Sequence, residues 1–262
     1  MTNNVEPKKN NNLFKVIYII SYILLTFLIG TLFMLLFAVI IANVRGENTH
    51  NVINFLTGNK DIAYTDLERD CAYTAQGYGN ALSYMIMFVL AIILLFPEFK
   101  EDLFSFKENK RFFIPYTLIA SVLFVGLAFL ITWLIGFAVK DSENQKTIVA
   151  IMKTKALVPM IISTVIFAPV VEEAIYRKLV FHYTPNQPMW ARYLISIVLF
   201  VLPHVTTSIG KFGVGEYFLM IIPYLTSAFM LAFIYHKGKF NIYTSIICHL
   251  LNNVLAIILV FI

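Results

Sequence analysis

The chain has 262 residues, of which 59% are hydrophobic and only 13% are charged. A soluble globular domain carries about 25% charged residues, so the composition excludes that class. The net charge of +5 comes from lysines and arginines in short segments beside apolar runs, where such residues set membrane topology. We therefore expect no nucleic-acid partner. Cys71 falls in a predicted loop and Cys248 in the last apolar run, so no disulfide framework is predicted.

Long stretches without a charged residue predict an all-α, polytopic transmembrane bundle. Four such stretches occupy residues 16–44, 72–97, 112–139 and 240–262, and about 20 apolar residues cross a bilayer. The short alternating segments of a β-barrel are absent from the sequence. We predict about seven spans, with six to eight compatible with the pattern. Their ranges are 14–44, 78–97, 112–139, 157–181, 191–209, 216–235 and 241–262.

The segments between these spans are short and polar. Residues 1–12 are rich in asparagine and predict a disordered tail, while 45–77 reads as a mixed-charge loop. Residues 98–111 are typical of an amphipathic surface segment, and 140–156 of a polar linker. The first apolar run is too long for a signal peptide, so it is interpreted as an uncleaved first span. The sequence shows no internal repeat, so it gives no support to an inverted-repeat transporter.

The distribution of lysine and arginine predicts the orientation. With the N-terminus inside, 12 of the 20 basic residues lie on the cytoplasmic side, as expected for short cytoplasmic loops. This places the tight turns 182–190 and 236–240 in the cytoplasm. We expect a multi-pass protein of the cell membrane with a cytoplasmic N-terminus.

The fourth predicted span carries two adjacent carboxylates, Glu172 and Glu173, after 16 uncharged residues. Each ionised group at the centre of a membrane helix costs about 2.5–3.5 kcal/mol, and two coupled carboxylates can act as an acid and base pair. Arg177 lies four residues after Glu173, on the same helix face, and is its natural partner. That pairing would leave Glu172 free for chemistry. The alternative, a snorkelling cluster near a helix end, places Glu172 too deep.

Two later spans carry further polar residues. His204 follows Phe200 by one turn, and His249 precedes Asn253 by one turn, so each pair shares a helix face. A histidine and an amide can donate hydrogen bonds to a developing oxyanion. Each pair also has a structural interpretation, as a core histidine or an interhelical polar contact.

Together, three spans place polar groups within the membrane, where such residues normally face one another or a cavity. Two interpretations follow. One is a water activated by Glu172 and His204, with His249 and Asn253 as oxyanion donors. The other is a metal site with carboxylate and imidazole ligands. The zinc motif HExxH is absent.

Three motifs in this order resemble the CPBP family of intramembrane proteases, also called the ABI or CAAX-protease-and-bacteriocin-processing family, which includes the type II CAAX prenyl endopeptidases. The motifs are EExxxR (Glu172, Glu173, Arg177), FxxxH (Phe200, His204) and HxxxN (His249, Asn253). The resemblance covers about residues 155–260. One departure is that Thr226, Ser227 and Ala228 stand where members frequently have glycine before the third motif; small residues still allow close helix approach.

The resemblance implies a glutamate-type intramembrane endopeptidase that hydrolyses a peptide bond of a membrane-associated or lipid-modified protein or peptide. In such enzymes the first glutamate and the second-motif histidine activate water, here Glu172 and His204. The third-motif residues, here His249 and Asn253, stabilise the oxyanion. The remaining motif residues, Glu173, Arg177 and Phe200, would support them. No cofactor is expected, although members are often described as metalloproteases, which keeps a divalent metal such as zinc as an alternative.

We therefore divide the chain into a tail (1–12), a variable transmembrane part (13–155) and a catalytic core (156–262). The expected partners are a membrane-associated substrate and the lipid bilayer. We expect the cavity between spans four and seven to open toward the cytoplasm. Two other functions remain open: a non-catalytic immunity or scaffold protein, and a proton-coupled transporter that uses the same groups as a relay.

Overall fold

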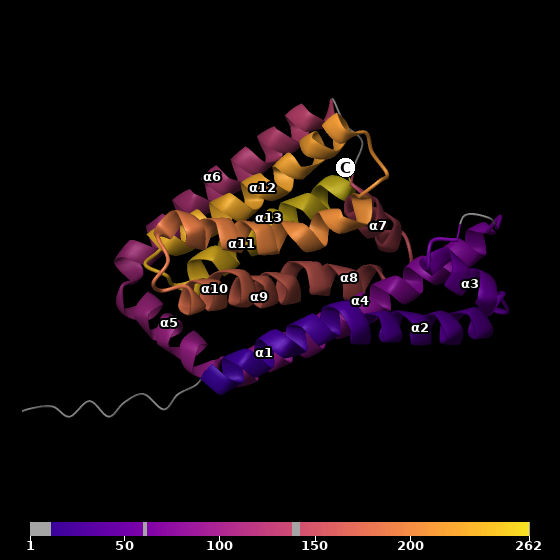
Figure 1. Cartoon of the computed structure of the whole chain (residues 1–262), viewed down its shortest axis with the longest axis horizontal. Helices are drawn as coiled ribbons and strands as arrows, with labels where there is room; N and C mark the ends of the chain where they lie inside the picture. The colour runs from indigo at the N-terminus through magenta and orange to yellow at the C-terminus, as the bar shows by residue number, and fades with distance from the viewer. Residues whose placement is uncertain (1–11, 60–61, 138–141, 262) are drawn as a thin grey trace, which may run out of the picture.

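The computed structural model describes residues 12–59, 62–137 and 142–261, and every regular element in these ranges is a helix (Figure 1). Within these described ranges, seven helices or runs of joined helices are long and apolar enough to cross a membrane. The prediction of an all-α membrane bundle is therefore confirmed. The predicted tail lies outside the described residues, except for Asn12, which begins the first helix.

The first span joins α1 (Asn12–Leu24) to α2 (Gly30–Arg45) through a π-helical turn (Leu25–Ile29). The short helix α3 (Thr49–Leu56) follows at its far end. The second span is α4 (Asp66–Leu94), which packs along α2.

The second span begins at Asp66, twelve residues before the predicted start at 78. Thr65 and Glu68 form a reciprocal capping box that satisfies the first amides of the helix. The charged residues Asp66, Glu68 and Arg69, which suggested a loop, belong to this first turn, and Asp70 pairs with Arg45 of α2. Cys71 is accordingly buried in α4 and not in a loop.

Two short helices lie at opposite ends of the bundle. Helix α5 (Phe96–Glu108) occupies the predicted surface segment, and α6 (Lys110–Gly136) is the third span. Helix α7 (Glu143–Met152) occupies the predicted polar linker. In Figure 1, α5 lies at one end, near α10 and the start of α11, and α7 lies at the other end, near the last residues of the chain.

The fourth span, Leu157–Tyr183, is irregular. It consists of α8 (Leu157–Ile162), α9 (Ala168–Glu173) and α10 (Val180–Tyr183), joined by π-helical segments at Ser163–Phe167 and Ala174–Leu179. Pro169 has no N–H to bond the carbonyl four residues earlier, which favours the widened turn before it. Such turns are frequent at functional sites, and here they flank the two glutamates.

The last three spans are α11 (Met189–Val205, continued by a 3-10 turn, Thr206–Ser208), α12 (Val214–Lys237) and α13 (Ile242–Val260). Figure 1 shows the fourth span between α4 on one side and α11 and α13 on the other.

This central position explains the burial of the fourth span: 50% of its most apolar stretch is buried, compared with 11% for the first span. One buried cluster includes both Met87 of α4 and Val171 of α9. The parts that the sequence divided therefore pack as one bundle, and their functional division stays a prediction.

Candidate active site

Glu173 and Arg177 form a fully buried ion pair at the centre of the bundle. Both side chains have 0% exposure, and Arg177 Nε lies 3.4 Å from Glu173 Oε2. Arg177 Nη2 donates to the carbonyl of Ala228 in α12 at 3.2 Å, and its guanidinium lies over the ring of Phe200, 4.6 Å from the centroid. The i, i+4 pairing proposed from the sequence is present. These contacts hold Glu173 in place, so it is not free to act on a ligand.

His249 connects the two glutamates. Its Nδ1 donates to Glu173 Oε1 at 3.0 Å, and its Nε2 lies 3.8 Å from Glu172 Oε2. A carboxylate accepts, so Nδ1 carries the proton in this contact, and the ring orientation is fixed. Nε2 faces Glu172 at a distance too long for a direct hydrogen bond, so a proton can pass between this nitrogen and Glu172 through one bridging water.

Tyr84 supplies the second contact to Glu172. Its hydroxyl, carried by α4, donates to Glu172 Oε1 at 2.9 Å. Glu172 is 5% exposed, and a buried carboxylate needs such a donor. The sequence analysis did not identify Tyr84, because one tyrosine in an apolar run looks like any other. Only its position across from Glu172 distinguishes it.

His204 lies on α11 with one nitrogen already used. Nδ1 donates to the carbonyl of Phe200 at 2.8 Å, and the ring stacks on that of Phe200 with centroids 4.9 Å apart. The ring of Tyr224 in α12 lies 5.3 Å from it. Since a main-chain carbonyl fixes the proton on Nδ1, Nε2 is left for a ligand.

Asn253 is oriented by the fourth span. Its amide nitrogen donates to the carbonyl of Thr164 at 2.9 Å. An amide carries two N–H groups, so one remains for a ligand. Thr164 belongs to the π-helical turn before the glutamates, which ties the third motif to the first.

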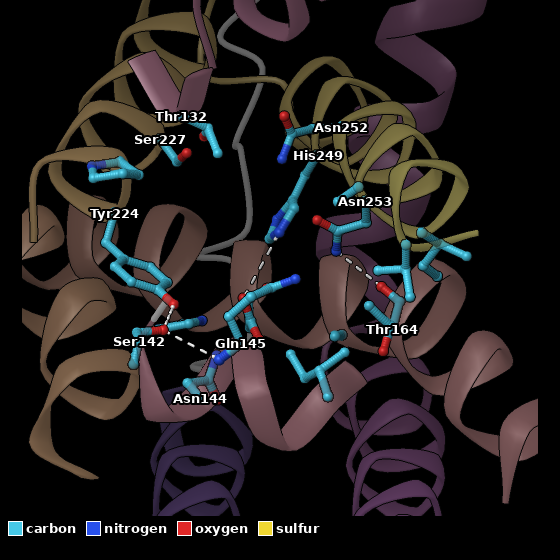
Figure 2. A pocket seen from close by; sticks show the side chains of 18 of the residues that line it. Thr132, Ser142, Asn144, Gln145, Thr164, Tyr224, Ser227, His249, Asn252 and Asn253 are labelled. Carbon is cyan, nitrogen blue, oxygen red and sulfur yellow. Dashed lines mark hydrogen bonds and ion pairs between the residues drawn. The ribbon is translucent and has the colours of Figure 1, made fainter. Parts of the chain in front are cut away.

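Glu172, Phe200, His204, His249 and Asn253 all line one cavity of about 380 Å³ (Figure 2). Glu173 and Arg177 do not line it and lie behind His249 and Phe200. The structure thus brings all seven predicted residues together and separates them into a cavity wall and a buried ion pair supporting it.

The cavity extends toward one end of the bundle. Its wall includes the end of α6, the first turns of α7, the start of α12 and the end of α13. The turns 184–188 and 238–241 lie at the opposite end and contribute nothing to the wall. The prediction that the turns and the cavity mouth share the cytoplasmic side is wrong, because they lie at opposite ends of the bundle.

The donor set does not match a metal centre with three protein ligands. In the described parts of the chain, no three His, Cys, Asp or Glu side chains are grouped to hold one ion. Glu172 Oε1 and His249 Nδ1 are also already engaged by Tyr84 and Glu173. A catalytic zinc site normally has three protein ligands, so we derive no step through a metal.

Comparison with known proteins identifies the region that carries the motifs. Residues 154–255, which contain spans four to six and most of span seven, match the family model described as type II CAAX prenyl endopeptidase Rce1-like. The family resemblance drawn from the three motifs is therefore confirmed for this region.

Two relatives extend over most of the chain. A protein of Mycoplasma capricolum subsp. capricolum, described as an uncharacterized protein, is 24% identical over 224 residues, which is 80% of this chain and 60% of the relative. The Bacillus subtilis protein named "Putative membrane peptidase YdiL" is 26% identical over 191 residues, 71% of this chain and 72% of the relative. The chain thus spans less than two thirds of the mycoplasma protein. No solved structure matches.

Proposed function

We propose that this chain hydrolyses a peptide bond of a membrane-associated or lipid-modified polypeptide inside its intramembrane cavity. The proposal starts from two findings: the chain is a multi-pass membrane protein, and its residues 154–255 match a CAAX-type peptidase family. The observation that carries the proposal is the environment of Glu172. This carboxylate lies in a cavity wall, with one oxygen held by Tyr84 and the other facing His249.

The proposed reaction uses Glu172 as general base and then general acid. A water molecule is held between Glu172 and Nε2 of His204. It gives a proton to Glu172 while the water oxygen attacks the scissile carbonyl carbon. The resulting tetrahedral intermediate collapses, the C–N bond breaks, and the protonated Glu172 gives its proton to the leaving amine. One water is consumed and no bond to the protein forms.

Asn253 and His249 are the proposed partners of the oxyanion. The contact with Thr164 fixes the Asn253 amide and leaves its second N–H for the developing negative charge. Because Nδ1–H of His249 already donates to Glu173, His249 donates to the oxyanion from Nε2 as the doubly protonated ring. Glu173 and Arg177 act as positioning residues, because they fix the ring of His249 and the face of Phe200.

We propose that the reaction is metal-independent, since the cavity groups are held by other side chains and not arranged as a ligand set. Purified protein should keep its cleavage rate after treatment with a divalent-metal chelator. A chelator-dependent loss that added zinc restores would contradict this point while leaving the peptidase proposal in place.

Comparison of peptides in cells that express the wild type or Glu172→Gln tests the function and finds the substrate. We expect membrane-associated precursors to accumulate and their released fragments to disappear with Glu172→Gln. The matched control is Glu216→Gln at the start of α12, where an amide can keep the contact to the amide of Gly213. An unchanged peptide profile together with a retained cellular phenotype in Glu172→Gln would favour a non-catalytic binding role.

A further inference from the structure

The bundle has two chemically different ends. The turn end is the one that carries α5 and the turns 184–188 and 238–241, and the mouth end is the one that carries α3 and α7 (Figure 1). The cavity that contains Glu172 extends to the mouth end. Its wall there includes Gly136, the last residue of α6, and Val260, the last residue of α13. Any substrate that enters the cavity along the bundle axis therefore arrives from that end.

Basic residues gather at the turn end. Apart from Arg177, nine of the fifteen described lysines and arginines lie there and six lie at the mouth end. The nine are Lys15, Lys100, Lys107, Lys110, Arg111, Lys178, Arg192, Lys237 and Lys239. The six are Arg45, Arg69, Lys146, Lys153, Lys155 and Lys211.

The connections at the two ends differ in length as well. The turn end has the short connections 184–188 and 238–241, flanked by Arg192, Lys237 and Lys239. The mouth end has short connections as well, at 153–156 and 206–213, but its connection between α2 and α4 is longer and holds its own helix α3. Lysine and arginine in short loops mark the cytoplasmic side, whereas longer loops count less. The larger number of basic residues beside its short connections therefore favours the turn end as the cytoplasmic end.

The cavity wall near the mouth is uncharged and rich in amides. Figure 2 shows Ser142, Asn144 and Gln145 of the α7 region together with Asn252 and Asn253 of α13 around the same space. No lysine, arginine or aspartate is among the described residues that line the cavity. An amide side chain donates and accepts hydrogen bonds, as a peptide backbone does, so this wall suits an extended, uncharged polypeptide.

We propose that the cavity faces the non-cytoplasmic side and takes an extended, uncharged segment of a polypeptide already carried across the membrane and still attached to it. The proposal rests on the proposed peptidase function for its substrate, but the orientation rests on the charge distribution and the cavity wall alone. It replaces the expectation of a cytoplasmic cavity, while it keeps the N-terminus in the cytoplasm.

Thiol labelling in intact bacterial cells tests the orientation without any activity. The background is Cys71→Ala with Cys248→Ala, since both cysteines are buried and free. Into it are placed Thr207→Cys at the mouth end and, as the matched control, Asn186→Cys at the turn end. Both residues are exposed, Thr207 in the 3-10 turn after α11 and Asn186 in the connection 184–188. A membrane-impermeant maleimide should label position 207 in intact cells and position 186 only after permeabilisation. Any other pattern overturns the orientation.

The substrate side has a separate readout. Cleavage sites mapped by comparing wild type with Glu172→Gln should lie on the non-cytoplasmic flank of the substrate's membrane segment, within a stretch free of charged residues. Sites on cytoplasmic flanks would overturn the substrate class while leaving the peptidase function intact. Absence of any Glu172-dependent cleavage would instead contradict the proposed function, whatever the labelling shows.

Discussion

The first and fourth spans differ in hydropathy and in burial, and in opposite directions. The first, Asn12–Arg45, has a mean hydropathy of 2.8 in its most apolar stretch and is 11% buried there, whereas the fourth, Leu157–Tyr183, has 1.7 and is 50% buried. The more apolar helix therefore faces outward. In a membrane, lipid is as apolar as leucine, so burial follows packing and polar contacts and not hydropathy.

Two ion pairs of the bundle differ in exposure in the same way as the two spans. Arg177–Glu173 has both side chains at 0% exposure, while Arg69–Asp66, near the start of the second span, has them at 48% and 100%. Both pairs lie within one helical turn. The buried pair holds the site together, and the exposed pair has solvent as an alternative partner, so their removal should have very different consequences.

The largest effect is expected for Arg177→Met. It leaves Glu173 buried without its cation, and breaking a buried pair costs about 3–5 kcal/mol. Unfolding in graded detergent denaturation should show this loss, whereas the matched Arg69→Met should change stability by no more than about 1 kcal/mol. The double variant Arg177→Met with Glu173→Gln should recover part of the loss. Equal effects of the two single variants would remove the distinction between the pairs.

The second-largest effect is expected from truncating a buried leucine of the fourth span, compared with an exposed leucine of the first. Leu179 in the fourth span is 2% exposed and Leu32 in the first is 56% exposed. Leu179→Ala removes packed methyl groups and should destabilise the bundle by about 2 kcal/mol or more, measured by the same unfolding assay. Leu32→Ala should lie within about 0.5 kcal/mol of the wild type. A larger loss at Leu32 would show that the first span is packed against something else.

A smaller effect is expected for Tyr84→Phe, which removes only the hydroxyl that holds Glu172 Oε1. A hydrogen bond to a charged group contributes about 1.5–3 kcal/mol, so kcat should fall by about tenfold or more, with KM little changed. An unchanged kcat would make Tyr84 a structural residue only.

The smallest effect concerns Glu143 of α7, at the mouth end. The hydrogen bond from Lys146 at 2.8 Å, aided by Lys211 at 3.3 Å, holds the pKa of Glu143 below its usual value. A carboxyl with a lowered pKa in the folded state stabilises the fold above its unfolded pKa of about 4.3, and loses this contribution as the pH falls through the folded pKa. The wild type should lose slightly more stability than Glu143→Gln between pH 6 and pH 3. Identical pH dependence would show that the contacts contribute nothing.

The sequence predicted much of this structure. The four later spans were predicted to within a few residues, because charge-free runs and short polar turns mark them. The buried polar residues Glu172, His204, His249 and Asn253 were identified because polar groups are costly in lipid. The family resemblance grouped them before the structure did.

The rest depended on how helices rotate against one another. Tyr84 meets Glu172 only because α4 lies against α9, and no periodicity in the sequence specifies that pairing. The start of α4 was missed because charges in a first helical turn look like a loop until the cap at Thr65 is recognised. The end toward which the cavity extends depends on where α7, the end of α6, the start of α12 and the end of α13 meet, and no single motif specifies that arrangement.

The most direct test of the central claim is the rate of peptide-bond cleavage by purified, vesicle-reconstituted protein on a substrate found in cells. Glu172→Gln should lower kcat by about 10²–10⁴-fold, the usual contribution of a general base, while Glu216→Gln leaves it unchanged. Both variants should unfold like the wild type in the detergent assay. A folded Glu172→Gln protein that cleaves at the wild-type rate would contradict the account.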